Sequence, residues 1–208
     1  MKKFLKILFV LMTMLSFENL VFATEKPMII YFSYYENADL PNDVDASASA
    51  SIQLWNEKRT GNTGVIANMI KDKTGGDIFP ILIADKYPES YDETVDLGRN
   101  EKNQNIRPRL ITHIENFNDY DTFFIGYPNW WSDMPMALYS FFDEYDFSGK
   151  TIIPFVTSGG SGFSNTINSI KSLEPNANVL EGLNISGRRV QGAEEKVEEW
   201  LKKLNYSD

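Results

Sequence analysis

The side chains that most often perform catalysis by themselves are nearly absent from this 208-residue sequence. It contains no cysteine, which excludes thiolate catalysis, thiolate metal sites, disulfides and a lipoprotein anchor. The single histidine, His113, leaves little material for a histidine-based zinc site. We therefore expect a bound cofactor to supply the chemistry, and we look for loops that could hold one.

A candidate phosphate-binding loop consists of four residues, Thr60, Gly61, Asn62 and Thr63, at the start of an expected helix over 63–74. Hydroxyl groups, an amide and backbone N–H groups at a helix N-terminus can bind a phosphate without a lysine. The same residues would also form an ordinary helix cap beside a glycine turn. Taken alone, this tetrapeptide leaves both interpretations open.

Two adjacent tryptophans, Trp130 and Trp131, lie in the segment 126–133, directly after another expected strand. Neighbouring residues in a loop rarely bury both indoles in one core. We therefore expect at least one of them, with Trp131 favoured, to stack on a flat ligand. The alternative is a hydrophobic plug over the helix that follows.

A third loop, over 157–162, has the sequence Thr-Ser-Gly-Gly-Ser-Gly. Glycine tolerates backbone angles that other residues resist, so backbone donors here could approach a ligand closely. A flexible turn would have the same composition. Together the three loops describe a ligand with a phosphate at one end, an aromatic plane at the other and polar ring edges. FMN is such a molecule.

The rest of the sequence predicts a scaffold that brings these loops to one edge. Short runs rich in β-branched and aromatic residues, without strict alternation, are typical of strands covered on both faces. We expect such strands near 28–33, 77–83, 121–127, 150–157 and 178–185. Apolar stripes at helical spacing predict helices between and after them, over 63–74, 134–142, 167–173 and 193–204.

This alternation predicts an α/β fold, a three-layer αβα sandwich around a five-stranded, doubly wound parallel sheet in the order 2-1-3-4-5. Ligands of such sheets bind outside the carboxyl ends of the strands, where all three loops are expected. Pro80 fits the second strand, which is an edge strand in this order. Pro154 falls in an internal strand and requires a bulge or an unpaired register there.

Composition and charge narrow the classes of partner. The sequence is 42% hydrophobic and 13% aromatic, which is enough for a packed core and excludes disorder as the main state. The 29 acidic and 20 basic residues give a formal charge of -9. A negative domain opposes nucleic acids and anionic membranes as ligands, and it suits cationic or neutral partners.

The first 23 residues predict a secretory signal peptide. Three lysines within the first six residues accompany an apolar run over 5–15, and a cleavage site follows Ala23. A retained anchor is the alternative, but polar residues interrupt the run below the ~20 residues that span a bilayer. Cleavage would leave an exported, periplasmic or extracellular domain over 24–208 with 17 basic and 28 acidic residues, a charge of -11. Its membrane contact would be transient.

With these motifs in this order, the sequence from about residue 27 to the end resembles the flavodoxin superfamily. Within it, the sequence is similar to FMN proteins with Gly-Asn-Thr, Gly-Tyr-Pro-x-Trp-Trp and Thr-Ser-Gly-Gly-Ser-Gly loops. The resemblance implies that FMN is the cofactor and that three groups of residues hold it. Its phosphate would be held by Ser33, Thr60, Gly61, Asn62 and Thr63. Its ribityl chain and isoalloxazine ring would contact Pro128, Asn129, Trp130 and Trp131, and the other side of the ring would lie against Thr157, Ser158, Gly159, Gly160, Ser161 and Gly162.

An insertion at about 34–59 departs from the family pattern. In short flavodoxins the phosphate loop follows the first strand almost at once, whereas here three aspartates and the Ala/Ser run 46–51 intervene. Loops longer than ~12 to 15 residues are usually functional lids or disordered. Ile52, Leu54 and Trp55 indicate that the end of the insertion packs on something. A partly ordered flap near the flavin and a detached surface excursion both stay open.

The resemblance implies a redox function that the flavin performs and the protein tunes. Acidic surroundings and an aromatic plane disfavour negative charge on a reduced flavin, which favours one-electron transfer to a redox partner protein with a basic docking face. The alternative is an FMN-dependent NAD(P)H oxidoreductase that reduces a quinone or nitro compound. That enzyme would need a second slot over the flavin, which the insertion could either form or block.

Two other functional classes stay open. A serine hydrolase would use Ser161, because the segment 159–163 approaches the nucleophile-elbow pattern, although Phe163 replaces its last glycine and only His113 could be the base. A ligand-binding protein without redox function would result if the exported chain never meets FMN. The signal lacks an Arg-Arg pair and so predicts export of an unfolded chain.

Overall fold

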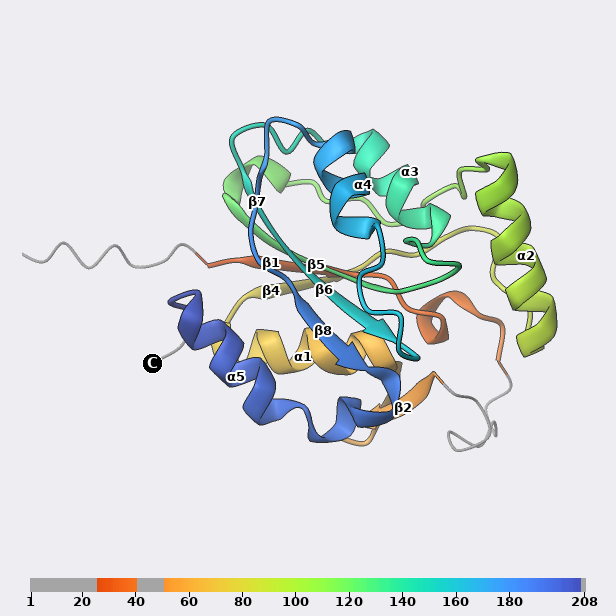
Figure 1. The fold of residues 1–208 in the computed structure, drawn as a ribbon, viewed down its shortest axis with the longest axis horizontal. Coiled ribbons are helices and arrows are strands. Elements are labelled where there is room, and N and C mark those ends of the chain that lie inside the picture. The colour runs from red at the N-terminus through yellow and green to blue at the C-terminus, as the bar shows by residue number, and fades with distance from the viewer. Residues whose placement is uncertain (1–25, 41–50, 207–208) are drawn as a thin grey trace, which may run out of the picture.

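The computed structural model describes residues 26–40 and 51–206. The expected signal peptide and most of the Ala/Ser run lie outside these residues. The described chain forms a parallel sheet between two layers of helices (Figure 1). The predicted α/β class and the doubly wound order of the strands are confirmed.

The sheet runs in the order β4-β1-β5-β6-β7, and β8 also pairs with β6. All of these pairs are parallel. The bounds are Met28–Tyr31 for β1, Asp77–Pro80 for β4, Thr122–Pro128 for β5, Thr151–Ser158 for β6, Asn178–Val179 for β7 and Leu183–Ser186 for β8. The predicted fifth strand is therefore two short pieces, β7 and β8, so the sheet has six strands and not five.

The break in the last strand explains how the sheet accommodates Pro154. The carbonyl of Ile152 accepts a hydrogen bond from the N–H of Leu180 at 2.9 Å, so residue 152 faces this neighbour. Backbone N–H and C=O groups of every second residue point toward the same neighbouring strand, so the backbone nitrogen of Pro154 also faces this neighbour. Pairing is interrupted there between Val179 and Leu183, so the missing N–H leaves no ladder partner unmatched. The expected unpaired register is confirmed.

Five helices accompany the sheet in the described chain. They are α1 (Asn62–Thr74), α2 (Tyr91–Gln104), α3 (Met136–Glu144), α4 (Thr166–Leu173) and α5 (Glu194–Lys203). Three 3₁₀ helices are η1 (Tyr35–Asn37), η2 (Phe117–Asp119) and η3 (Gly187–Gly192). Figure 1 shows α1 and α5 on one face of the sheet and α3 and α4 on the other.

Alternating side chains of the central strands form a separate core on each face. Ile29 packs into the cluster that includes Val65 of α1 and Trp200 of α5. Ile30 packs into the cluster that includes Leu138 of α3. Because both faces are buried, the strands are apolar runs without alternation, as the sequence predicts.

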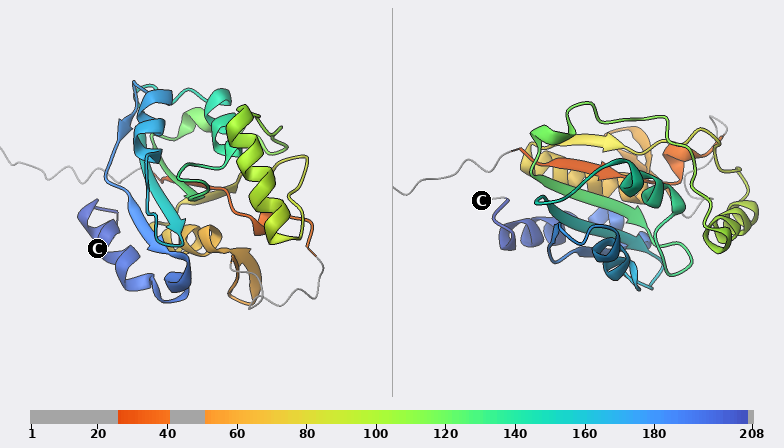
Figure 2. Two further views of the ribbon diagram at one scale, coloured as in Figure 1. Left: turned by 45° about the vertical axis from the view of Figure 1, so that its right-hand side comes forward. Right: turned by 90° about the horizontal axis from the view of Figure 1, so that it is seen from above.

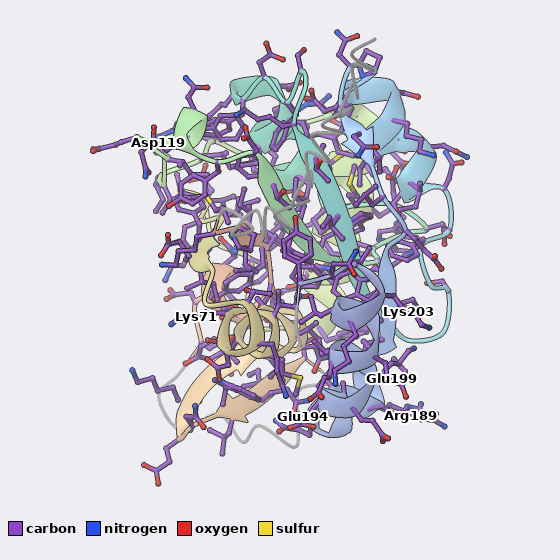
Figure 3. All side chains as sticks on the ribbon, turned by 90° about the vertical axis from the view of Figure 1, so that its left-hand side faces the viewer. Lys71, Asp119, Arg189, Glu194, Glu199 and Lys203 are labelled. Atoms are coloured by element: carbon purple, nitrogen blue, oxygen red, sulfur yellow. The ribbon has the colours of Figure 1, made fainter. Side chains whose placement is uncertain are left out.

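The outer side of α5 carries charge. Figure 3 shows Glu194, Glu199 and Lys203 on the solvent side of this helix, and Lys71 on the exposed side of α1. The inner side of α5 buries Val197, Trp200 and Leu201, which confirms the predicted stripe. Within the described ranges, no helix is both long enough and apolar enough to span a bilayer.

The helix α2 is absent from the sequence-based prediction. It begins after Ser90, whose hydroxyl accepts a hydrogen bond from the N–H of Glu93 at 3.4 Å, and ends at Asn105 in a left-handed conformation. This Ser-x-x-Glu pattern is a capping signal that could have revealed the start of the helix. The apolar stripe is weak because α2 stands beyond the end of the sheet toward which the strands run (Figures 1 and 2).

The end of the insertion forms an antiparallel hairpin, β2 (Ile52–Trp55) with β3 (Lys58–Gly61). Its two turn residues both have positive φ, as a two-residue type I′ turn requires. Ile52 is buried and Trp55 packs against the core beneath α1, so the expectation that this end packs is confirmed for them. Leu54 is instead 52% exposed.

Candidate functional site

Hydrogen bonds join the three predicted loops at one edge of the sheet. The hydroxyls of Thr63 and Thr157 lie 2.9 Å apart. The backbone N–H of Asn129 donates to the carbonyl of Thr157 at 2.9 Å. The side-chain amide of Asn129 donates to the carbonyl of Gly162 at 2.8 Å. The chain therefore brings together loops that are about a hundred residues apart, at the carboxyl ends of parallel strands.

One end of this site is a hydroxyl cradle, which we define as the side chains of Ser33, Thr60 and Thr63. Each is buried, with between 1% and 5% of its surface exposed. Ser33 follows β1, Thr60 lies in β3 and Thr63 lies in the first turn of α1, where the helix presents backbone donors. A Cβ at Gly61 would collide with the Ser33 hydroxyl, and one at Gly64 would collide with the Thr60 hydroxyl. Only glycine allows this close approach.

One expected phosphate donor is used elsewhere. The backbone N–H of Asn62 donates to the carbonyl of Ser51 at 2.9 Å and so continues the hairpin ladder. Its side-chain oxygen accepts a hydrogen bond from Gln53 at 2.9 Å. The backbone N–H of Asn62 is therefore directed at Ser51, and the expectation that it faces a phosphate is wrong. The amides of Gly61 and Thr63 stay as candidates.

The carboxylate of Glu36 lies against the cradle, and the sequence-based interpretation missed it. The Ser33 hydroxyl donates to Oε2 and the Thr60 hydroxyl donates to Oε1. The Tyr31 hydroxyl donates to Oε1 at 3.3 Å. Burial and the Glu36 carboxylate raise the pKa of Tyr31, which therefore keeps its proton. Ser33 and Glu36 have a Ser-x-x-Glu spacing, but the contacts of Glu36 with Tyr31 of β1 and Thr60 of β3 join separate elements, and no local pattern signals them.

The other end of the site is a tight turn that presents the two tryptophans. Trp130 and Asp133 exchange backbone hydrogen bonds of 2.9 Å in both directions. The residues between them, Trp131 and Ser132, have φ of 55° and 60°. Side chains other than glycine or asparagine are uncommon in this conformation, and such strain tends to occur at functional sites.

Trp130 is half-buried in a core that α2 completes. Its indole meets the rings of Phe32 and Tyr87 edge-on, with centroid distances of 5.7 and 5.1 Å. A Cβ at Gly98 of α2 would lie 3.3 Å from this indole, so the ring packs closely on the helix. The premise that paired loop tryptophans have no core to fill is therefore wrong for Trp130.

Trp131 lies at the surface, with 43% of its area exposed. Its indole N–H donates to the carbonyl of Val95 at 3.0 Å, and the guanidinium of Arg99 lies over the ring, 5.0 Å from its centroid. Because α2 covers one face of the indole, the opposite face is the one that a flat ligand could contact. Stacking by Trp131 stays a prediction.

A buried polar pair lies beneath Trp130. The hydroxyl of Tyr87 donates to Oε2 of Glu101 at 2.8 Å. Burial raises the pKa of Glu101, although the hydrogen bond from Tyr87 lowers it. Burial raises the pKa of Tyr87 as well. Burial therefore makes ionisation of the Glu101 carboxyl less favourable than it would be in water.

The third loop offers accessible backbone. Thr157 and Ser158 are buried at the end of β6, whereas Gly159, Gly160 and Ser161 are exposed. A Cβ at either of these two glycines would meet open space. The Ser158 hydroxyl accepts a hydrogen bond from the N–H of Gly162 at 3.0 Å and so closes the loop. The backbone over 159–161 is therefore accessible to a ligand, and contact with a flavin edge stays a prediction.

The residues of the hydrolase interpretation are not brought together. Nδ1 of His113 lies 2.9 Å from the carboxylate of Glu144, and His113 is not hydrogen-bonded to Ser161. Ser161 therefore lacks the base that a nucleophile needs. In the portion of the chain that the structure describes, no group of three or more histidine, aspartate or glutamate side chains could hold a metal ion.

Comparisons with known proteins agree with this geometry. A family model described as flavodoxin matches residues 58–204, which begins at β3. A protein of Bacteroides uniformis assigned as a flavoprotein is 27% identical, with a TM-score of 0.66 over 85% of this chain and 97% of its own. A Bacteroides eggerthii protein with the same assignment is also 27% identical, with a TM-score of 0.62 over 86% and 98%.

A more distant structure shares the fold. A flavoprotein of Lactobacillus acidophilus in complex with FMN is 16% identical, with a TM-score of 0.57 over 80% of this chain and 97% of its own. No curated protein matches the chain.

Proposed function

Because this chain belongs to the flavodoxin family, we propose that it is an FMN-binding flavoprotein that exchanges electrons with a partner protein. The observation that carries the proposal is the junction of three loops at the carboxyl ends of β1, β5 and β6, with hydroxyls at one end and an exposed indole at the other. Bound FMN would supply the redox chemistry, and the chain would hold and orient it.

The residues present suit each part of FMN. The hydroxyl cradle and the positive end of the α1 dipole suit a phosphate dianion. The exposed face of Trp131 suits the isoalloxazine ring. The open backbone over 159–161 suits the polar edge of that ring.

Two features favour a carrier over a nicotinamide-dependent enzyme. The hairpin at the end of the insertion lies at the phosphate end, where Gln191 of η3 donates to Gln53 and to the carbonyl of Leu54 at 3.1 and 2.9 Å. It therefore does not build a second slot over the ring end. The cations beside Trp131 also lie against carboxylates: Arg99 pairs with Asp96, and Lys102 pairs with Asp133. These pairs reduce the attraction for an anionic nicotinamide cofactor.

Titration of FMN with the domain over 24–208 tests cofactor binding. We expect quenched flavin fluorescence and a one-to-one complex, because an indole in contact with the ring quenches its emission. Titration with riboflavin in parallel measures how much the phosphate contributes. Retention of free-flavin fluorescence at all protein concentrations would exclude both flavins as ligands.

Stopped-flow mixing separates the carrier from the enzyme. We expect slow or no reduction of the complex by NADPH, and fast electron exchange with a basic redox protein. The exchange should slow as salt rises, since attraction toward a domain of charge -11 is screened within ~8 Å at physiological ionic strength. Saturable reduction by NADPH followed by many turnovers with a quinone would favour the reductase.

We also propose that the domain acts outside the cytoplasm. The lysines and apolar run of the first 15 residues support this location. Fractionation of cells that express the full chain tests it, with N-terminal sequencing of the exported product. We expect a new terminus near Thr24. An intact chain in the cytoplasm would contradict the proposal.

A further inference from the structure

The contacts of Glu36 carry an inference about ligand specificity that rests on the proposed binding of FMN. We propose that the Glu36 carboxylate is a specificity-determining internal anion: it occupies the hydroxyl cradle in the free protein and must leave when a phosphate binds. The residue thereby sets how strongly the site prefers FMN over riboflavin, which has no phosphate.

The backbone holds Glu36 at this position through the next residue, Asn37, which is 1% exposed. The side-chain amide of Asn37 donates to the carbonyls of Ser33 and Ile81 at 3.0 and 2.9 Å. Its side-chain oxygen accepts a hydrogen bond from the N–H of Ile83 at 2.9 Å. Since η1 is anchored to two strand ends, the carboxylate approaches the cradle from a fixed point.

The carboxylate uses the donors that a phosphate would need. The hydroxyl groups of Ser33 and Thr60 each carry one proton, and both donate it to Glu36. A Cβ at Gly64 would lie 3.1 Å from Oε1 of Glu36, and one at Gly61 would lie 3.5 Å from Oε2. The carboxylate therefore lies beside Gly61 of the phosphate loop and Gly64 in the first turn of α1.

Glu36 and a phosphate are also both anions. Among the residues that the structure describes, no lysine, arginine or histidine forms an ion pair with Glu36 that could offset their repulsion. Sharing the cradle would place two like charges within a few ångströms in a partly buried site. We therefore infer exchange of one anion for the other, and not joint binding.

The exchange affects the two flavins differently. FMN must displace the carboxylate before its phosphate can accept hydrogen bonds from the cradle. Riboflavin has no group that competes there, so Glu36 can keep its hydrogen bonds when riboflavin binds. The carboxylate thus weakens FMN binding selectively and keeps the buried hydroxyls hydrogen-bonded when no phosphate is present.

Affinities of FMN and riboflavin for the domain over 24–208 test the inference. Glu36→Gln keeps the size of the side chain and removes its charge, and Glu36→Ala removes the competing group. We expect the FMN dissociation constant to fall about tenfold in Glu36→Gln, because hydrogen bonds to charged acceptors are roughly twice as strong as neutral ones. A further fall is expected in Glu36→Ala. The riboflavin dissociation constant should change less than about twofold, because riboflavin has no phosphate that competes with the residue 36 side chain for the cradle.

Glu57→Gln is the matched control. Glu57 lies at the exposed turn of the hairpin that supplies Thr60, so this variant loses the same charge without changing the cradle. We expect wild-type affinity for both flavins. Equal gains in Glu57→Gln and Glu36→Gln would show that only long-range charge matters, and would overturn the proposal. An FMN constant in both Glu36 variants that equals or exceeds the wild-type value would also overturn it.

Inorganic phosphate separates this inference from the proposed function. We expect millimolar phosphate to raise the melting temperature of Glu36→Ala and to leave that of the wild type almost unchanged. If neither flavin binds to any variant, the proposed function fails, and the phosphate result still decides whether Glu36 occupies an anion site. Equal stabilisation of both proteins by phosphate would overturn the inference.

Discussion

The two ends of the candidate site differ in whether their groups already have partners within the protein. At the phosphate end, buried hydroxyls already donate to an internal carboxylate. At the ring end, an indole is 43% exposed and two glycines face open space. At the first, closed end, a phosphate would have to displace the Glu36 carboxylate. At the second, open end, a flat ligand could contact the exposed indole without displacing another group.

The physical chemistry of the groups explains this difference. A buried hydroxyl without a partner is unfavourable, so the closed end needs an acceptor whether or not a phosphate is present. An exposed aromatic ring carries a much smaller penalty, and apolar surface is common on folded proteins. Under the proposed function, selectivity for phosphate would belong to one end of the site and access for electrons would belong to the other.

The largest effect is expected when the donors of the closed end are removed. In the Glu36→Ala background, where no carboxylate uses these donors in the free protein, Ser33→Ala combined with Thr60→Val should raise the FMN dissociation constant more than a hundredfold, since each hydrogen bond to a charged group contributes about 1.5 to 3 kcal/mol. Riboflavin affinity should stay close to the wild-type value. Fluorescence titration measures both constants, and an equal loss for the two flavins would show that the cradle does not bind the phosphate.

Removal of Trp130 should affect stability more than ligand binding. Trp130→Ala empties the space between Phe32, Tyr87 and α2, and should lower the free energy of unfolding by about 3 kcal/mol. Trp131→Ala, at the exposed neighbour, should lower it by less than about 1 kcal/mol. Urea denaturation compares the two variants. Equal losses would mean that both indoles serve the core, and the ring end would then lack an open aromatic surface.

Removal of the Trp131 side chain should weaken the binding of FMN and of riboflavin to the same extent. Trp131→Ala should reduce the affinity for FMN and for riboflavin about tenfold, in line with a stacking contribution of about 1 to 1.5 kcal/mol. Quenching of the bound flavin should decrease as well. Trp131→Phe should restore part of both signals. A loss confined to FMN would place Trp131 near the phosphate and would contradict the division between the two ends.

The smallest effect concerns the carboxyl group beneath the ring end. Burial raises the pKa of Glu101 above 4.5, so its folded-state value exceeds its unfolded value. The stability that it contributes is present below about pH 4.5 and is lost as the pH rises through the folded-state pKa. Compared with Glu101→Gln, the wild type should therefore lose unfolding free energy with rising pH. Urea denaturation across this range measures the difference, and a difference that does not vary with pH would rule out this titration.

The sheet and its loops could be predicted because their signals are local. Apolar runs such as 122–128 are strands because both of their faces are buried, and the order of a doubly wound sheet then places their loops at one edge. Pro80 and Pro154 could be assigned to an edge and to an unpaired register because proline lacks an N–H. The helix α2 was missed because its packing partner is a loop indole and not the sheet.

By itself, the sequence determined the fold class, the strand order and the identity of the three loops, since each depends on residue type and spacing along a short segment. Only the tertiary structure decided which tryptophan lies in a core, which amide the hairpin uses and what contacts the cradle. Trp130 meets Gly98, Asn62 meets Ser51 and Glu36 meets Thr60 through packing between separate elements. A hydrogen bond or a ring contact depends on distances of a few ångströms, and the folded chain sets those distances.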